Sequence, residues 1–308
     1  MANITAKDVA ELRAKTGLGM MDCKKALVEA DGDMDKAITI LREKGLATAA
    51  KKESRIAADG IVKLMNKGDA YAIIEVNSET DFVAKNASFQ EFVDGLLDTI
   101  LTNRPADIDA LLKTNYVGTD SAVESVLVEK IAQIGEKLSI RRFNVLEGNA
   151  ISSYVHGNGS IGVLVKFDTN VADKDEFAAF AKNIALQIGA YPTPYLNREQ
   201  VPASVLEEEK NILLAQIAND PANAKKPDAI KEKMVMGRIS KFYDNNCLLD
   251  MTYVKDEDMK VSAYVAATAK ELGGNIAIVD FCRYEKGEGI QKREENFAEE
   301  IAKMTAGK

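Results

Sequence analysis

The stretch Tyr71-Ala72-Ile73-Ile74-Glu75-Val76 decides the fold of this chain, because it reads as a strand and is followed by residues with a helical period. Three aromatic or aliphatic residues mark the buried side of that helix: Phe89, Phe92 and Leu96. The order strand, loop, helix occurs again where the strand 161–167 precedes apolar residues with the same steps of three and four: Phe177, Phe180 and Ile184. The sequence therefore contains a duplicated unit.

A second pattern supports the duplication. The residues Ile134-Gly135, Leu138, Ile140, Phe143 and Glu147 recur at a constant offset of 138 residues as Leu272-Gly273, Ile276, Ile278, Phe281 and Glu285. Each copy thus supplies strand, loop, helix, an excursion, helix and strand, and a sheet of this kind needs helices to cover its apolar face. We expect one α+β subdomain at 56–148 and a second at 149–189 and 246–287.

Residues 1–55 predict a compact module of three helices. Thr5 caps the first helix, with Asp8 as an imperfect second half of a capping box, and Leu12 lies on the buried side. Asp33 caps the third helix, which we expect to end at Gly45.

Two further helical segments interrupt and follow the second copy. Residues 190–245 predict a helical hairpin that begins with a capping box of Ser204 and Glu207. Residues 288–308 predict a short helix with apolar residues at helical steps: Phe297, Ile301 and Met304. A helix this short is marginal alone, so it packs either on this chain or on a partner.

Composition narrows the function. The chain has 308 residues, and its 40 basic and 48 acidic side chains give a net charge of −8, which does not favour direct nucleic-acid binding. No apolar run approaches the roughly 20 residues that span a bilayer, and the N-terminus lacks a signal peptide's apolar core, so we expect a cytoplasmic protein without membrane contact. Three widely spaced cysteines, a single histidine and the absence of a phosphate-cradling loop predict no metal site, no cofactor and no nucleotide binding by the chain itself.

The loop after the strand 71–76 carries Asp81 and Phe82. Loops on a rigid scaffold are where binding groups concentrate, and an exposed aromatic side chain can insert into a partner. The alternative is that Phe82 folds back to cap its own helix. The loop of the second copy, 168–173, has no aromatic residue, and this difference favours a specific role for Phe82.

The run Asn77-Ser78-Glu79-Thr80-Asp81-Phe82-Val83-Ala84-Lys85 resembles the signature of the elongation factor Ts family, the nucleotide exchange factors of the GTPase elongation factor Tu. Other parts of the chain resemble the same family in the same order. These parts are 16–27 (Thr-Gly-Leu-Gly-Met-Met-Asp-Cys-Lys-Lys-Ala-Leu), 57–60, 134–136, 154–157 with 161–165, and 283–290.

The resemblance implies a mechanism. Phe82 inserts between helices of elongation factor Tu while Asp81 holds the loop beside it, and Thr80 and Val83 maintain the loop's shape. The movement of those helices disturbs the Mg²⁺ environment of the GTPase and releases GDP. The resemblance also implies that the N-terminal module is of the ubiquitin-associated type, that the hairpin is a coiled coil, and that a homodimer or a 2:2 complex can form.

The resemblance implies further partner contacts, and several have a structural alternative. The implied contacts are Leu12, Met20, Met21, Lys24, Ile134, Gly135 and His156. Met20 and Met21 can instead pack in the core of the small module. Gly135 can be a helix stop shared with its duplicate Gly273, and His156 can be a plain surface residue.

Two competing functions remain open. The first is an adaptor of the ubiquitin-associated type, which would bind a partner through the helices near Met20 without changing nucleotide release. The second is an enzyme that uses Glu79 and Asp81 as acid and base, although no nucleophile, pocket or metal set accompanies them. We therefore expect no enzymatic activity.

Overall fold

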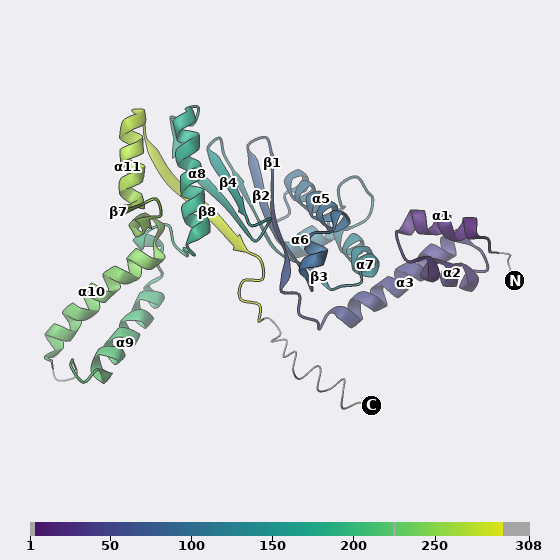
Figure 1. The fold of residues 1–308 in the computed structure, drawn as a ribbon, viewed down its shortest axis with the longest axis horizontal. Coiled ribbons are helices and arrows are strands. Elements are labelled where there is room, and N and C mark those ends of the chain that lie inside the picture. Colours follow the sequence, from purple (N-terminus) through teal and green to yellow (C-terminus); the bar gives the residue numbers. More distant parts are fainter. Residues whose placement is uncertain (1–3, 224–225, 292–308) are drawn as a thin grey trace. The chain divides into compact units, whose positions relative to one another are not determined.

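Two three-stranded sheets carry the duplicated core of the computed structural model, which describes residues 4–223 and 226–291 (Figure 1). The first sheet has the order β1-β2-β3 and the second has the order β4-β5-β8. Their bounds are β1 Asp59–Lys67, β2 Ala70–Ser78, β3 Leu138–Glu147, β4 Ile151–His156, β5 Ile161–Thr169 and β8 Ile276–Glu285. In both sheets the second strand of the copy lies in the middle, so the two copies have the same topology.

The helices repeat with the strands. Helix α7 (Val123–Ile134) precedes β3, and α11 (Val261–Leu272) precedes β8; every bound of the second pair lies 138 residues after its equivalent. Helices α5 (Ala87–Asn103) and α8 (Asp175–Ala190) follow the central strands. The predicted phenylalanine pairs are buried in these two helices, as Phe89 with Phe92 and Phe177 with Phe180. The predicted duplication is therefore confirmed.

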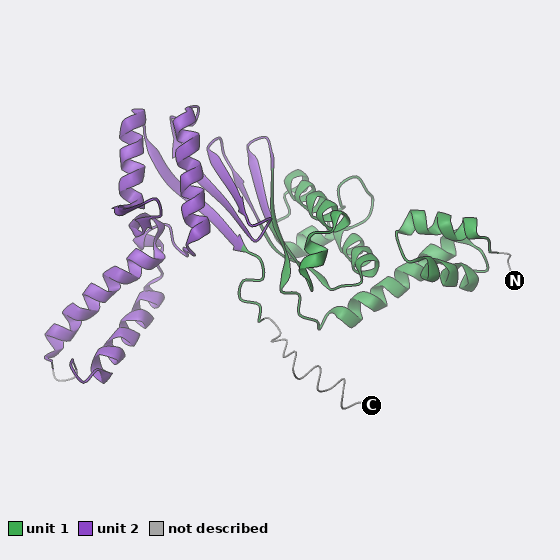
Figure 2. Ribbon diagram, in the orientation of Figure 1, with its two compact units in different colours: residues 1–65, 74–143, 285–308 green, residues 66–73, 144–284 purple. Residues whose placement is uncertain are grey.

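The chain divides into two compact units (Figure 2). The first unit consists of residues 1–65, 74–143 and 285–308, and the second consists of residues 66–73 and 144–284. The predicted borders at 55, 148, 189, 245 and 287 describe a finer division and stay predictions. The predicted C-terminal helix with Phe297, Ile301 and Met304 lies outside the described residues.

Three helices form the N-terminal module, and they share one apolar core. Their bounds are α1 Ala6–Thr16, α2 Met20–Glu29 and α3 Met34–Lys52. The capping box of Thr5 and Asp8 is complete, and Asp33 caps α3, as predicted. However, α3 does not end at Gly45. This glycine faces α7, where an added Cβ would lie 3.6 Å from the Cβ of Ala132, and packing against that helix accounts for the continuation of α3 to Lys52.

In the second unit, α9 (Ala203–Asn219) and α10 (Asp228–Asn246) form the predicted helical hairpin. Their shared core consists of Leu213, Ile217, Val235 and Ile239. The predicted capping box is wrong, because α9 begins directly after Pro202 and Ser204 already lies in its first turn without a capping hydrogen bond. The remaining elements are α4 Asp81–Ala84, α6 Ile108–Lys113, 3₁₀ turns Arg198–Gln200 and Leu248–Asp250, β6 Thr252–Tyr253 and β7 Asp256–Lys260.

Candidate functional site

Phe82 lies on the four-residue helix α4, between the end of β2 at Ser78 and the start of α5 at Ala87. Its side chain is 79% exposed, the largest value among the exposed large hydrophobic residues of the described chain. The next residue, Val83, is buried, so α4 turns one apolar side chain inward and presents the other to solvent. The alternative in which Phe82 folds back on its own helix is wrong.

Two carboxylates fix the base of this loop. The Glu136 carboxylate accepts hydrogen bonds from the Thr80 backbone N–H (3.0 Å) and from the Thr80 hydroxyl (2.7 Å). The Glu79 carboxylate accepts the backbone N–H of Lys137 at 2.6 Å and pairs with the Arg55 guanidinium at 3.2 Å. The loop and the turn after α7 therefore hold each other through reciprocal bonds.

Asp81 is engaged by its own helix rather than by the loop base. Its carboxylate accepts a hydrogen bond from the Lys85 ammonium at 2.6 Å, and both side chains are exposed. This hydrogen bond lowers the pKa of Asp81 below its ordinary value. The Lys85 ammonium also lies 6.0 Å from the centre of the Phe82 ring. Asp81 therefore remains ionised near neutral pH, which does not suit a general acid. The Glu79 carboxylate is already bound to Lys137 and Arg55.

The predicted contacts on the N-terminal module differ in exposure. Met20 and Met21 are 55% and 64% exposed on α2, so the alternative of core packing is wrong for both. Lys24 is exposed on the same helix. Leu12, in contrast, is fully buried in the core of the module. It offers no surface to a partner, and we remove it from the candidate contacts.

Gly135 ends α7 with φ +81°, and Gly273 ends α11 with φ +66°. The left-handed conformation favours glycine at both positions, so a structural role as helix stop is confirmed for Gly135 and its duplicate. Ile134 is half-buried beside it. His156 lies in the second unit at the end of β4, where its Nδ1 and the Tyr154 hydroxyl are 2.8 Å apart.

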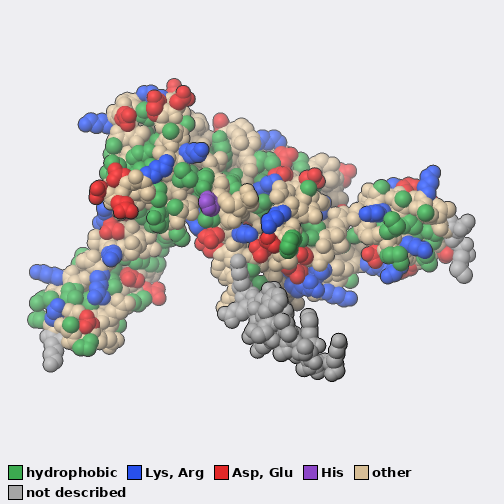
Figure 3. Space-filling view, viewed as in Figure 1, with side chains coloured by type: hydrophobic (Ala, Val, Ile, Leu, Met, Phe, Trp, Pro, Cys, Tyr) green, Lys and Arg blue, Asp and Glu red, His purple; other side chains and the backbone are tan. Residues whose placement is uncertain are grey.

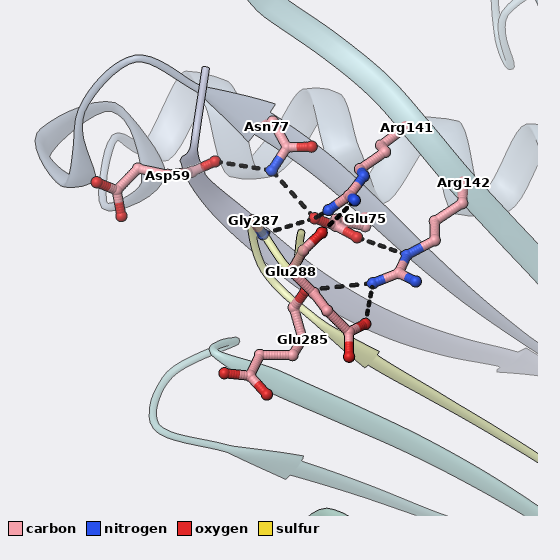
Figure 4. Close-up of polar contacts among 8 residues, drawn as sticks. All are labelled: Asp59, Glu75, Asn77, Arg141, Arg142, Glu285, Gly287 and Glu288. Atoms are coloured by element: carbon pink, nitrogen blue, oxygen red, sulfur yellow. Dashed lines mark hydrogen bonds and ion pairs between the residues drawn. The ribbon is translucent and has the colours of Figure 1, made fainter. Parts of the chain in front are cut away.

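A buried charge cluster in the first unit was not predicted from the sequence (Figure 4). Glu75 on β2 is fully buried, and its carboxylate accepts hydrogen bonds from Arg141 (2.9 Å), Arg142 (2.6 Å) and the Gly287 backbone N–H (2.8 Å). Arg142 also pairs with Glu288 at 3.0 Å. These bonds hold residues 285–288 against β2 and β3. The only sequence signal was an acidic residue within an otherwise apolar strand.

On the face shown in Figure 3, Lys and Arg side chains are mixed with Asp and Glu side chains, and the basic side chains do not form one large patch. Within residues 4–223 and 226–291, no three His, Cys, Asp or Glu side chains lie close enough to hold a metal ion. Among the helices described, none is long and apolar enough to cross a membrane.

Comparisons with known proteins agree with these features. The family model described as elongation factor TS matches residues 79–288, which include the Phe82 loop, both duplicated helix-strand pairs and the hairpin. The chain belongs to the elongation factor Ts family. The elongation factor Ts of Syntrophotalea carbinolica is 45% identical over 98% of this chain and 99% of its own length. The elongation factors Ts of Clostridium kluyveri (46%; 99% and 100%) and Clostridium perfringens (47%; 98% and 99%) are similarly close. Membership in the elongation factor Ts family gives the chain a role in translation elongation.

Proposed function

We propose that this chain accelerates the release of GDP from elongation factor Tu by inserting Phe82 between helices of that GTPase. The observation that carries the proposal is the exposure of Phe82 on a helix whose base is fixed by Glu79 and Glu136. Much of a GTPase's affinity for nucleotide comes from backbone donors around the phosphates and from Mg²⁺ held by nearby side chains. Displacing the helices that support the Mg²⁺ site therefore weakens the binding of GDP, although the exchange factor does not contact the nucleotide.

The energetics show how much Phe82 can contribute. If an exchange factor lowers the affinity of the GTPase for GDP by a given factor, GDP lowers the affinity of the GTPase for the exchange factor by the same factor. Each factor of ten corresponds to about 1.4 kcal/mol. Burying one phenylalanine side chain contributes up to ~3 kcal/mol. Phe82 can thus supply about a hundredfold at most, and a wider interface supplies the rest.

That wider interface includes the exposed or half-exposed residues named above. Met20, Met21 and Lys24 lie on one helix of the N-terminal module, Ile134 lies next to the loop base, and His156 lies in the second unit. We further propose that the N-terminal module is of the ubiquitin-associated type, that the hairpin is a coiled coil, and that the chain performs no covalent chemistry. We also propose that a homodimer or a 2:2 complex can form.

The test is the release of labelled GDP from elongation factor Tu, with Phe82→Ala compared to the wild-type chain. We expect the variant to lower the catalysed release rate about tenfold to a hundredfold. Tyr191→Ala is the matched control, because Tyr191 is an aromatic residue, 48% exposed in the second unit. Its release rate should equal that of the wild type. Equal acceleration by Phe82→Ala would contradict the mechanism.

The adaptor hypothesis predicts a different outcome. An adaptor would bind elongation factor Tu through Met20 and Met21 and leave the GDP release rate unchanged at saturating concentration. The exposure of both methionines supports a partner surface on α2, but an exchange factor uses such a surface as well. Measuring the binding and the release rate of the same samples separates the two functions.

A further inference from the structure

The duplication offers a comparison within the chain for the base of the Phe82 loop. In the first copy the connection between the central strand and the following helix is residues 79–86, and in the second copy it is residues 170–174. The first connection has eight residues and the second has five. The three additional residues allow the first copy to form α4, which presents Phe82. The second copy has no equivalent helix.

One bond at the base of the connection is common to both copies. In the first copy the Glu79 side chain accepts the Lys137 backbone N–H at 2.6 Å. In the second copy the Asn170 side chain accepts the Asn275 backbone N–H at 2.9 Å. Glu79 and Asn170 are each the first residue after the central strand, and Asn275 is the duplicate of Lys137. This bond therefore belongs to the shared fold.

The bonds of Glu136 occur in one copy only. The duplicate of Glu136 is Gly274, which has no side chain. A Cβ at Gly274 would lie 2.4 Å from Cγ1 of Val171 and 2.5 Å from Oδ1 of Asn170. The short connection of the second copy thus packs directly on glycine, whereas the longer connection of the first copy leaves room for a glutamate. The second copy forms its sheet and helices without this carboxylate.

We propose that Glu136 is a positioning residue that fixes the direction of Phe82, a role that rests on the proposed function. A helix of one turn is too short to be stable by itself. Thr80 is the N-cap residue of α4, yet its hydroxyl makes no capping bond and donates to Glu136 instead. With the backbone N–H of Thr80 bound to the same carboxylate, the start of α4 is held by Glu136, and Phe82 follows two residues later.

The first experiment needs no partner protein. The chain has no tryptophan, so Phe82→Trp introduces a single tryptophan, which can be excited selectively over the tyrosines and whose anisotropy decay reports the mobility of α4. In that background, Glu136→Ala should increase the amplitude of the fast depolarisation. Glu136→Gln keeps one acceptor oxygen and should give an intermediate amplitude. Glu124→Ala, an exposed glutamate at the start of the same helix α7, is the control and should change nothing. An unchanged decay in Glu136→Ala would overturn the proposal.

The second experiment tests the role in exchange by combining substitutions. Glu136→Ala alone should lower the catalysed GDP release rate about tenfold, which corresponds to the loss of a charge-assisted hydrogen bond. If Glu136 acts through Phe82, it should have no further effect in the Phe82→Ala background. The same loss in both backgrounds would mean that Glu136 contacts the GTPase directly, and the positioning role would then be wrong.

The two experiments also separate this inference from the proposed function. If Phe82→Ala releases GDP as fast as the wild type, the proposed mechanism fails, while the anisotropy still decides whether Glu136 holds α4. If Phe82→Ala is impaired and the anisotropy is unaffected by Glu136→Ala, the mechanism stands and the positioning role fails. Circular dichroism should be unchanged by Glu136→Ala, because the second copy folds with glycine at this position.

Discussion

Replacing Glu75 by alanine should destabilise the first unit more than replacing Glu288 by alanine. Both carboxylates pair with Arg142, but Glu288 lies at the surface. Glu75 is fully buried and accepts hydrogen bonds from two guanidinium groups, the Asn77 side-chain amide and one backbone N–H. Removing it leaves two positive charges without their central acceptor. A buried ion pair is costly to break, because the remaining charge stays desolvated, and such losses reach ~3–5 kcal/mol.

The structure places the expected loss at the lower end of that range. The side chains of Arg141 and Arg142 are 27% and 30% exposed, so water can solvate them partly after the substitution. Arg142 also keeps its ion pair with Glu288. We therefore expect about 3 kcal/mol for Glu75→Ala. Glu288→Ala removes a 45% exposed carboxylate from one ion pair and should cost about 0–1 kcal/mol.

Urea unfolding followed by hydrogen exchange of the segments 74–78 and 138–143 measures this difference, because both segments belong to the first unit. The free energy of unfolding of that unit should fall for Glu75→Ala and stay near the wild-type value for Glu288→Ala. The Gly287 amide should also lose protection in Glu75→Ala, since its acceptor is removed. Equal losses in the two variants would refute the reasoning that burial makes Glu75 the centre of the cluster.

Two further predictions follow from close contacts and burial. Gly95→Ala should lower the free energy of unfolding by about 0–2 kcal/mol, because the new Cβ would lie 1.8 Å from the Tyr116 hydroxyl oxygen, and the overpacking cost of about 1–3 kcal/mol is offset by a gain of about 1 kcal/mol in helix propensity; a variant clearly more stable than the wild type would contradict the packing. None of the buried thiols of Cys23, Cys247 and Cys282 should react with a thiol reagent at pH 8 before the chain unfolds. Burial raises the pKa of Cys247 to about 11, so only on the order of one thiol in a thousand is ionised at that pH, and fast labelling of Cys247 in the native chain would be inconsistent with this.

The sequence was sufficient for those features that depend on local periodicity. The steps of three and four in Phe177, Phe180 and Ile184 and their equivalents identify the covering helices, because burial of one helix face imposes that spacing. The place of Phe82 between a strand and a helix also followed from its neighbours, but its exposure did not, because the residues alone left open that Phe82 folds back on its own helix. In each case the residues that determine the feature lie within a few positions of one another.

Other features depend on distant residues and were missed for that reason. The strand β1 was not predicted, since only residues 60–62 of its nine are buried and Lys63 and Asn66 interrupt the apolar pattern. Gly45 signals the end of a helix locally, yet α3 continues where it packs against α7. Glu75 binds a residue 212 positions away. No local pattern can indicate such a partner.

Comparing the two copies also separates residues that serve the fold from residues available for contact. Gly135 and Gly273 adopt the same conformation at the same helix end, so the fold alone accounts for Gly135. Ile134 and Leu272 occupy one equivalent position, but Leu272 is 8% exposed in the second copy whereas Ile134 is only half-buried in the first. The fold provides cover for this apolar position in one copy and leaves it partly open in the other. Ile134, next to the turn that holds the Phe82 loop, is therefore the stronger candidate for a contact with elongation factor Tu.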